Sequence, residues 1–271
     1  MPPLPGRLGP VLREDLRVTT VDIRRSDSTP VDAGKLDDVA VRMGGARPLV
    51  QFVARADVRA RRSDVAGNQW PFIRAERAAL IADLENVSDA AWSTPSLCAG
   101  WTVREVLAHM TSVAKMTPGR FIGKFAGSGF RFNAMNESCM KAELGPTPAE
   151  TLAGFKAQLD GTIHPLGGVD TLVGDMVIHS QDIRRPLGIP HTFQPEALTL
   201  VGDVVIRGNL LLGGKRRATG LKLTATDQDW TRGAGLEVKG PLASIIIVLT
   251  GRKAGLPDLS GDGVAVLTSR V

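Results

Sequence analysis

The chain has 271 residues, of which 43% are apolar and 23% are charged, values typical of a globular protein. It is long enough to bury a substantial core in one large domain or two small ones. No apolar run approaches the roughly 18 residues of a transmembrane helix, and the N-terminus has prolines and acidic residues where a signal peptide needs an apolar segment. We therefore expect a cytoplasmic protein without a membrane partner.

The net charge of +5 does not indicate a nucleic-acid partner. Residues 1–66 hold 12 Lys and Arg against 9 Asp and Glu, whereas the rest of the chain holds 21 against 19. No basic stripe with interleaved aromatic residues accompanies this charge, so we expect no nucleic-acid binding. The two cysteines, Cys98 and Cys139, are too few for a disulfide framework and are expected to be buried apolar residues.

Residues 1–66 lack helical or strand periodicity, and their Pro, Gly, Arg and Asp residues are scattered. This composition predicts a disordered or marginally structured extension. The alternative is that the segment is a spurious extension and that translation begins downstream, for example at Met43. In both cases we expect the fold to begin near residue 67.

The first predicted helix lies in the run WPFIRAERAALIADLENVS, where five apolar residues share one face: Ile73, Leu80, Ile81, Leu84 and Val87. Glu76 and Arg77 interrupt this face near its start, so the first turn of the helix is expected to be more exposed than the rest. Thr102 and Glu105 form a capping box, which predicts a second helix from Val103. His109 lies about two turns into that helix, on its buried side.

Two further bundle helices are predicted in the middle of the chain. Residues 117–146 are ambiguous, and residues 122–135 are either helical or a loop over the site. An N-cap pattern with proline in the first turn predicts a third helix over residues 147–159. The fourth covers Asp170 to Arg185 and ends at Pro186.

The C-terminal part changes from helical to mixed patterns. A helix is predicted from Pro195 to about Leu212, followed by strands over residues 221–226 and 236–239. Pro241 opens an apolar helix, and a short helix follows Gly263. The prediction is a mainly α protein in which four helices precede a compact α/β tail.

Asp175 and His179 are four residues apart and therefore project from the same helical face. His109, on another helix of the same bundle, supplies a third donor. Two imidazoles and a carboxylate suit zinc, and also nickel, cobalt, manganese or iron, and three protein ligands leave a position open for water, thiol or substrate. The alternative is that His109 is a core histidine and that the other two are a surface pair.

Other polar residues have structural interpretations beside functional ones. Asp182, one turn after His179, either orients that imidazole or pairs with Arg184 or Arg185. The two arginines are expected to pair with acidic residues of the bundle. His164 and His191 lie in proline-containing loops and are expected to be exposed.

Three segments, GWTVREVLAHM, IHSQDIRRPLG and ATDQDWTRGAGLEVKGP…LTGR, resemble the mycothiol-dependent maleylpyruvate isomerase family of actinobacteria, within the broader DinB/YfiT-like bundles. The resemblance covers about residues 68–270, in the family's order. It implies a DinB-like metal-binding four-helix bundle over residues 67–190. It also implies a small α/β C-terminal domain, related to sterol-carrier-like folds, over residues 191–271.

By position, the resemblance assigns the metal ligands to His109, Asp175 and His179. Metal-binding relatives often have Glu where this chain has Asp175, which keeps the carboxylate but reaches about one methylene less far. Arg252, in LTGR, matches a basic residue near the relatives' active site, and is therefore predicted to be catalytic, anchoring a substrate carboxylate or stabilising an enolate. The alternative is a helix C-terminal arginine that offsets the macrodipole.

The resemblance implies an enzyme that uses a divalent metal, with zinc favoured, and mycothiol as thiol cosubstrate. The thiolate would add to a small electrophilic substrate, leading to isomerisation or S-transfer. The alternatives are a non-catalytic protein that binds a metal or an apolar small molecule, and a metal-dependent hydrolase that needs no thiol. We expect a monomer or homodimer whose partners are the substrate and the thiol.

Overall fold

The structure is a computed structural model that describes residues 68–208 and 213–271. The predictions for residues 1–66 lie outside the described residues. In chain order the helical elements are α3 (Trp70–Glu85), the 3₁₀ helix η2 (Asp89–Ser93), α4 (Val103–Ala114), α5 (Pro118–Gly127), α6 (Phe132–Glu143), α7 (Pro148–Lys156), α8 (Val169–Arg184), α9 (Pro195–Arg207), α10 (Gly214–Ala218), α11 (Leu242–Leu249), the 3₁₀ helix η3 (Lys253–Asp258) and α12 (Val264–Thr268). The strands are β1 (Leu221–Ala225), β2 (Thr231–Gly233) and β3 (Leu236–Gly240).

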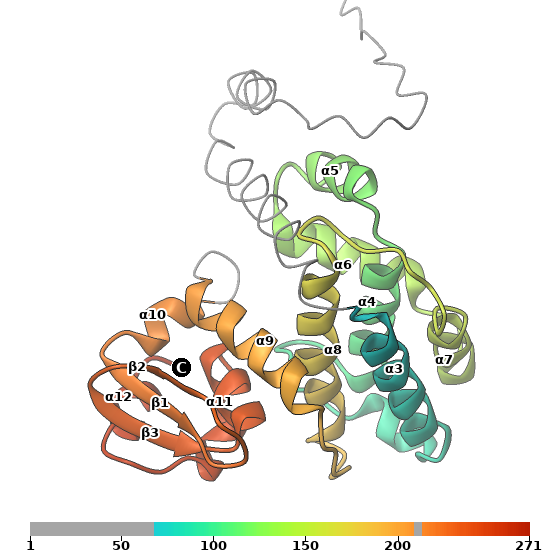
Figure 1. The fold of residues 1–271 in the computed structure, drawn as a ribbon. Helices are drawn as coiled ribbons and strands as arrows, with labels where there is room; N and C mark the ends of the chain where they lie inside the picture. The colour runs from blue at the N-terminus through green and yellow to red at the C-terminus, as the bar shows by residue number, and fades with distance from the viewer. Residues whose placement is uncertain (1–67, 209–212) are drawn as a thin grey trace, which may run out of the picture.

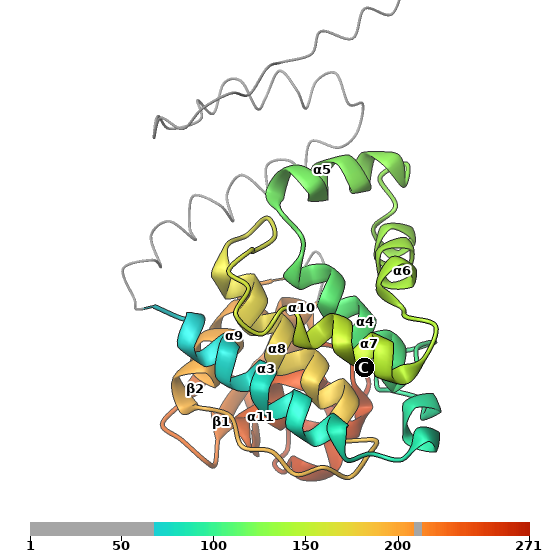
Figure 2. The same cartoon turned by 90° about the vertical axis from the view of Figure 1, so that its right-hand side faces the viewer.

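The four helices predicted for the bundle, α3, α4, α7 and α8, pack together as expected. Helices α3 and α4 each contact both α7 and α8, so the four surround a shared apolar core (Figure 2). The ambiguous segment forms helices α5 and α6, which change direction at Phe130, a residue with a φ of 61°. Helix α6 packs on α4, and α5 projects beyond the bundle (Figure 1).

Local sequence signals define where the bundle helices begin. Thr102 and Thr147 accept hydrogen bonds from the backbone amides of Glu105 and Glu150, and each glutamate side chain accepts one from the backbone amide of its cap residue. These two capping boxes satisfy amide groups that have no partner within the helix. Both predicted starts, for α4 and α7, are confirmed.

The predicted exposure of the first turn of α3 is wrong, because Phe72 and Ile73 in that turn are only 8% and 0% exposed. Glu76 and Arg77, which interrupt the apolar face, are also buried, at 5% and 1% exposed. Glu76 lies 2.8 Å from Nε2 of His191 and 3.7 Å from a guanidinium nitrogen of Arg184. Arg77 donates to two backbone carbonyl groups that follow α7. Burial of these charged groups is tolerated because each one meets partners of opposite charge or polarity.

The C-terminal part, residues 195–271, is named the tail here, and it contains a three-stranded sheet in the order β2-β1-β3. Strand β1 pairs antiparallel with β2 and parallel with β3. Both predicted strands are confirmed, whereas the short polar strand β2 and helix α10 were not predicted. The helix predicted for residues 195–212 ends at Arg207, and residues 209–212 lie outside the described part.

Helix α11 connects the tail to the bundle. Its residues are almost entirely buried, and it contacts β1 and β3 of the sheet as well as α8 and α9 (Figure 1). The fold is therefore mainly helical with a small mixed α/β tail, as predicted. In the described residues, no helix combines the length and the apolar character needed to cross a membrane.

Candidate metal centre

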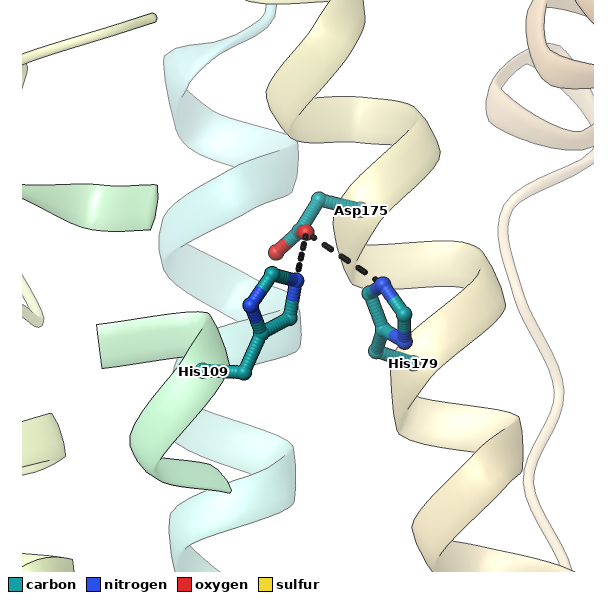
Figure 3. Close-up of side chains that lie close together, drawn as sticks. All are labelled: His109, Asp175 and His179. Carbon is teal, nitrogen blue, oxygen red and sulfur yellow. Dashed lines mark ion pairs between the residues drawn. The ribbon is translucent and has the colours of Figure 1, made fainter. Parts of the chain in front are cut away.

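His109, Asp175 and His179 converge between α4 and α8, with both imidazoles turned toward the carboxylate (Figure 3). The Oδ1 atom of Asp175 lies 3.8 Å from Nε2 of His109 and 3.7 Å from Nε2 of His179. One donor atom from each residue lies within 4.8 Å of the other two. The side chains are 8%, 10% and 17% exposed, so the centre is nearly closed to solvent.

The donor set fits a divalent metal ion. A tetrahedral zinc with bonds of about 2.0–2.1 Å has ligand atoms about 3.3 Å apart. The two distances from Asp175 would have to shorten by roughly half an ångström, and the distance between the two imidazole nitrogens, which is within 4.8 Å, by at most about 1.5 Å. Among the described residues, none donates a hydrogen bond to the Asp175 carboxylate. A buried carboxylate without hydrogen bonds is unfavourable unless a cation accompanies it.

The metal-free electrostatics differ between the two histidines. Burial, followed by the neighbouring His179, lowers the pKa of His109 to about 3, so its imidazole is neutral at physiological pH. Burial would also lower the pKa of His179, but its hydrogen bond to Asp182 and the charge of Asp175 outweigh this and raise the pKa. Burial raises the pKa of Asp175 to about 6, although His179 and Arg77 oppose the shift.

Asp182 holds the second histidine. Its Oδ2 atom lies 2.9 Å from Nδ1 of His179, which leaves Nε2 directed at Asp175. Asp182 is fully buried, and burial would raise its pKa, but hydrogen bonds from His179 and Arg252 keep the pKa below its usual value. This is the carboxylate–histidine arrangement that commonly orients a metal-binding imidazole. Of the two alternatives for Asp182, contact with the imidazole is the one present.

Arg252 reaches this network from the tail. Its Nε and Nη2 atoms donate to the two oxygens of Asp182 at 3.0 and 2.7 Å, and Nη1 donates to the carbonyl of Thr250. Burial would lower the pKa of the guanidinium, but the bond to Asp182 raises it. Arg252 is therefore linked to His179 through Asp182, and does not lie against the three candidate ligand atoms of His109, Asp175 and His179.

Two predictions about neighbouring polar residues need correction. Arg184 pairs with Asp83 of the bundle as expected, but Arg185 pairs with Asp258 of the tail because it lies at the C-terminal end of α8, against α11 and η3. His191 is not an exposed loop residue, since its imidazole contacts the buried Glu76. His164 is half-buried and takes no part in the three-residue cluster.

Two residues that lie near the candidate metal centre, Arg77 and Cys98, were not predicted to lie there. The positive charge of Arg77 acts on Asp175, and the only signal in the sequence was that this arginine interrupts an apolar helix face. Cys98 is half-buried beside Asp182 and Arg252, and burial followed by the charge of Asp182 raises the pKa of its thiol. Cys139 is buried as predicted.

Comparisons with known proteins agree with this architecture. Residues 73–167 match the family described as the mycothiol maleylpyruvate isomerase N-terminal domain, a segment that includes His109 and ends before Asp175. A search of the curated proteins gives no match.

Two solved structures are similar: the mycothiol-dependent maleylpyruvate isomerase, with a TM-score of 0.50, and a histidine-to-alanine mutant of that enzyme, with a TM-score of 0.49. Each is 18% identical, and each alignment covers 72% of this chain and 91% of the other. At this identity the likeness concerns the fold alone. Residues 73–167 therefore resemble the mycothiol maleylpyruvate isomerase N-terminal domain, and the fold is similar to that of the solved isomerase.

Proposed function

We propose that this protein is a metal-dependent enzyme that uses a low-molecular-weight thiol, mycothiol, either to isomerise a small electrophilic substrate or, as an S-transferase, to join the thiol to that substrate. The observation that carries the proposal is the convergence of His109, Asp175 and His179 in one nearly closed centre. The family of the bundle supplies the identity of the thiol. The proposal includes a division of the chain into a bundle domain over residues 67–190 and a C-terminal α/β domain over residues 191–271, which contains the tail.

In this proposal the three converging residues hold the metal, with zinc favoured by the nitrogen and oxygen donors. A bound divalent metal lowers the pKa of a coordinated thiol, as it lowers that of water. His109 contributes a neutral imidazole because its low pKa keeps it unprotonated. Asp182 fixes the ring of His179, so that Nδ1 carries the proton and Nε2 is free to bind.

Arg252 has a second role in the proposal, which is to anchor an anionic group of the substrate. Three of its five N–H groups are used by Asp182 and Thr250, so two remain for a substrate carboxylate. Burial strengthens such a charge-assisted contact, and the side chain is only 14% exposed. Arg252 is thus both a support for Asp182 and the residue that we propose as catalytic.

The decisive experiment is metal analysis of the full-length protein beside the His109→Ala, Asp175→Ala and His179→Ala variants. We expect about one metal per wild-type chain and loss of metal in each variant. In cobalt-substituted protein, addition of mycothiol should change the visible absorption spectrum. A wild type that stays metal-free after reconstitution with zinc, nickel and manganese would remove the basis of the proposal.

The same samples separate the alternatives. A protein that binds metal but whose cobalt spectrum does not respond to any thiol is not thiol-dependent. Hydrolytic turnover without thiol would favour a hydrolase with a metal-bound water. Stoichiometric metal without turnover of any electrophile would favour a binding protein.

A further inference from the structure

The interface between α8 and the tail holds two ion pairs of opposite polarity. Asp182 of α8 accepts from Arg252 of the tail, and three residues later Arg185 donates to Asp258 of the tail at 2.9 Å. Arg185 also donates to the hydroxyl of Ser244 at 2.7 Å, and that hydroxyl donates to Asp258 at 2.6 Å. Each side of the interface therefore presents one cation and one anion to the other.

Both tail residues of these ion pairs lie at the ends of the same short element. Arg252 is the N-cap of η3, and Asp258 is its last residue. Between them Gly255 lies so close to α11 that an added Cβ would be 2.8 Å from the carbonyl oxygen of Ser244. Because η3 packs this tightly on α11, we expect a shift at one of its ends to be transmitted to the other.

We propose that Arg185, with Ser244 and Asp258, is a positioning residue for the metal centre, an inference that rests on the proposed function. Fixing the far end of η3 against α8 holds Arg252 on the carboxylate of Asp182. Asp182 in turn holds the imidazole of His179 by its Nδ1 atom. The opposite polarity of the two ion pairs also sets one register between α8 and η3, because a shifted register would bring like charges together.

The structure favours this role over a simple surface ion pair. Ser244 is 1% exposed and Gln181, which accepts from Nε of Arg185, is 4% exposed, so the guanidinium is held by buried partners on one side. The side chains of Arg185 and Asp258 are still 28% and 40% exposed, so removing this ion pair should leave the fold intact. Loss of this ion pair is expected to change the metal affinity of the centre more than it changes the stability of the fold.

The test is the Asp258→Ala variant of the full-length protein, with Glu237→Ala as matched control. Glu237 is also a carboxylate of the tail and pairs with two lysines of the sheet, away from α8. Replacing the outer-shell partner of a ligand changes metal affinity by about 10–100-fold. Asp258 acts on that partner, Asp182, only through η3 and Arg252, so its removal should weaken cobalt binding less, by about three- to tenfold. The control should bind cobalt as the wild type does.

A double-mutant cycle separates positioning from general destabilisation. In an Arg252→Gln background, Asp258→Ala should cause no further loss of cobalt affinity, because its effect passes through Arg252. Additive losses in the cycle, or unchanged affinity in Asp258→Ala alone, would overturn the inference.

A metal-free measurement keeps this outcome distinct from failure of the proposed function. In apo protein, the Nε–H resonance of Arg252, assigned by its loss in Arg252→Gln, should exchange faster with water in Asp258→Ala than in wild type or control. An unchanged exchange rate overturns the inference even if no metal binds. If the wild type binds no metal but Asp258→Ala still shows the faster exchange, the proposed function is overturned and the contact pathway from Arg185 to Arg252 stands.

Discussion

The Nδ1 atom of His179 lies 2.9 Å from Oδ2 of Asp182, while Nε2 of the same ring lies 3.7 Å from Oδ1 of Asp175. The imidazole of His179 therefore links two parts of the structure: the buried ion pair between Asp182 and Arg252 of the tail, and the cluster that His179 forms with His109 and Asp175. Because the two ring nitrogens have different partners, the tautomer that binds a metal through Nε2 is set by the protein.

Replacing Asp182 by Asn should weaken metal binding by about 10–100-fold, because the amide neither fixes the same tautomer nor balances Arg252. Competition with a chromogenic chelator measures the change. Asp83→Asn is the control, since Asp83 also binds an arginine of α8 but lies outside the centre. Equal affinities for the Asp182 variant and the wild type would show that this contact does not support the ligand.

His109→Ala should abolish the stabilisation that a bound metal gives. A ligand that binds only the folded state raises stability by about 4 kcal/mol at a thousandfold excess over its dissociation constant. Zinc should therefore raise the Tm of the wild type and leave that of the variant unchanged in a thermal scan. A zinc response that persists in the variant would place the metal elsewhere.

Asp175→Asn should stabilise the metal-free protein at pH 7.5 by about 1–3 kcal/mol while it removes metal binding. The folded pKa of Asp175, about 6, lies above its ordinary value of 3.8, so ionisation of this carboxyl opposes folding above pH 6. That cost diminishes as the pH falls from 6 toward 3.8, and the two proteins should then converge in stability. Urea unfolding at several pH values measures the difference. A variant less stable than the wild type at pH 7.5 would contradict this prediction.

Metal affinity should fall as the pH decreases through about 6, because protons then compete for Asp175 and His179. The pKa of His109 is about 3, so this histidine does not contribute to the acid limb. Asp182→Asn removes the hydrogen bond that raises the pKa of His179, and should move the acid limb toward lower pH. Cobalt titrations between pH 5 and pH 8 test both statements, and an acid limb that is unchanged in the variant would contradict the second.

Glu76→Gln should destabilise the bundle by about 3–5 kcal/mol, since it leaves the buried Arg184 with one anionic partner fewer. Urea unfolding measures the loss. Glu85→Gln, which changes an exposed ion pair at the other end of α3, is the control and should shift stability by less than about 1 kcal/mol. Equal effects of the two substitutions would show that the buried network adds nothing.

Most of the helical architecture was predictable because its signals are local. The capping boxes at Thr102 and Thr147 fix helix starts through contacts three residues apart, and Pro186 follows Arg185, the C-cap residue of α8. The spacing of Asp175 and His179 placed both on one face of α8 for the same reason. Strand β2 was missed because its three residues carry no alternation, and only pairing with β1 makes them a strand.

The sequence by itself determined the helices, the two main strands and the three residues that are candidates for a metal, since periodicity, capping and spacing act within a few residues. Only the tertiary structure decided what surrounds them. The contact of Arg252 with Asp182 joins residues 70 positions apart, and the burial of Glu76 depends on His191, 115 positions away. Such contacts depend on how helices pack, and no local pattern specifies the partner of a buried charge.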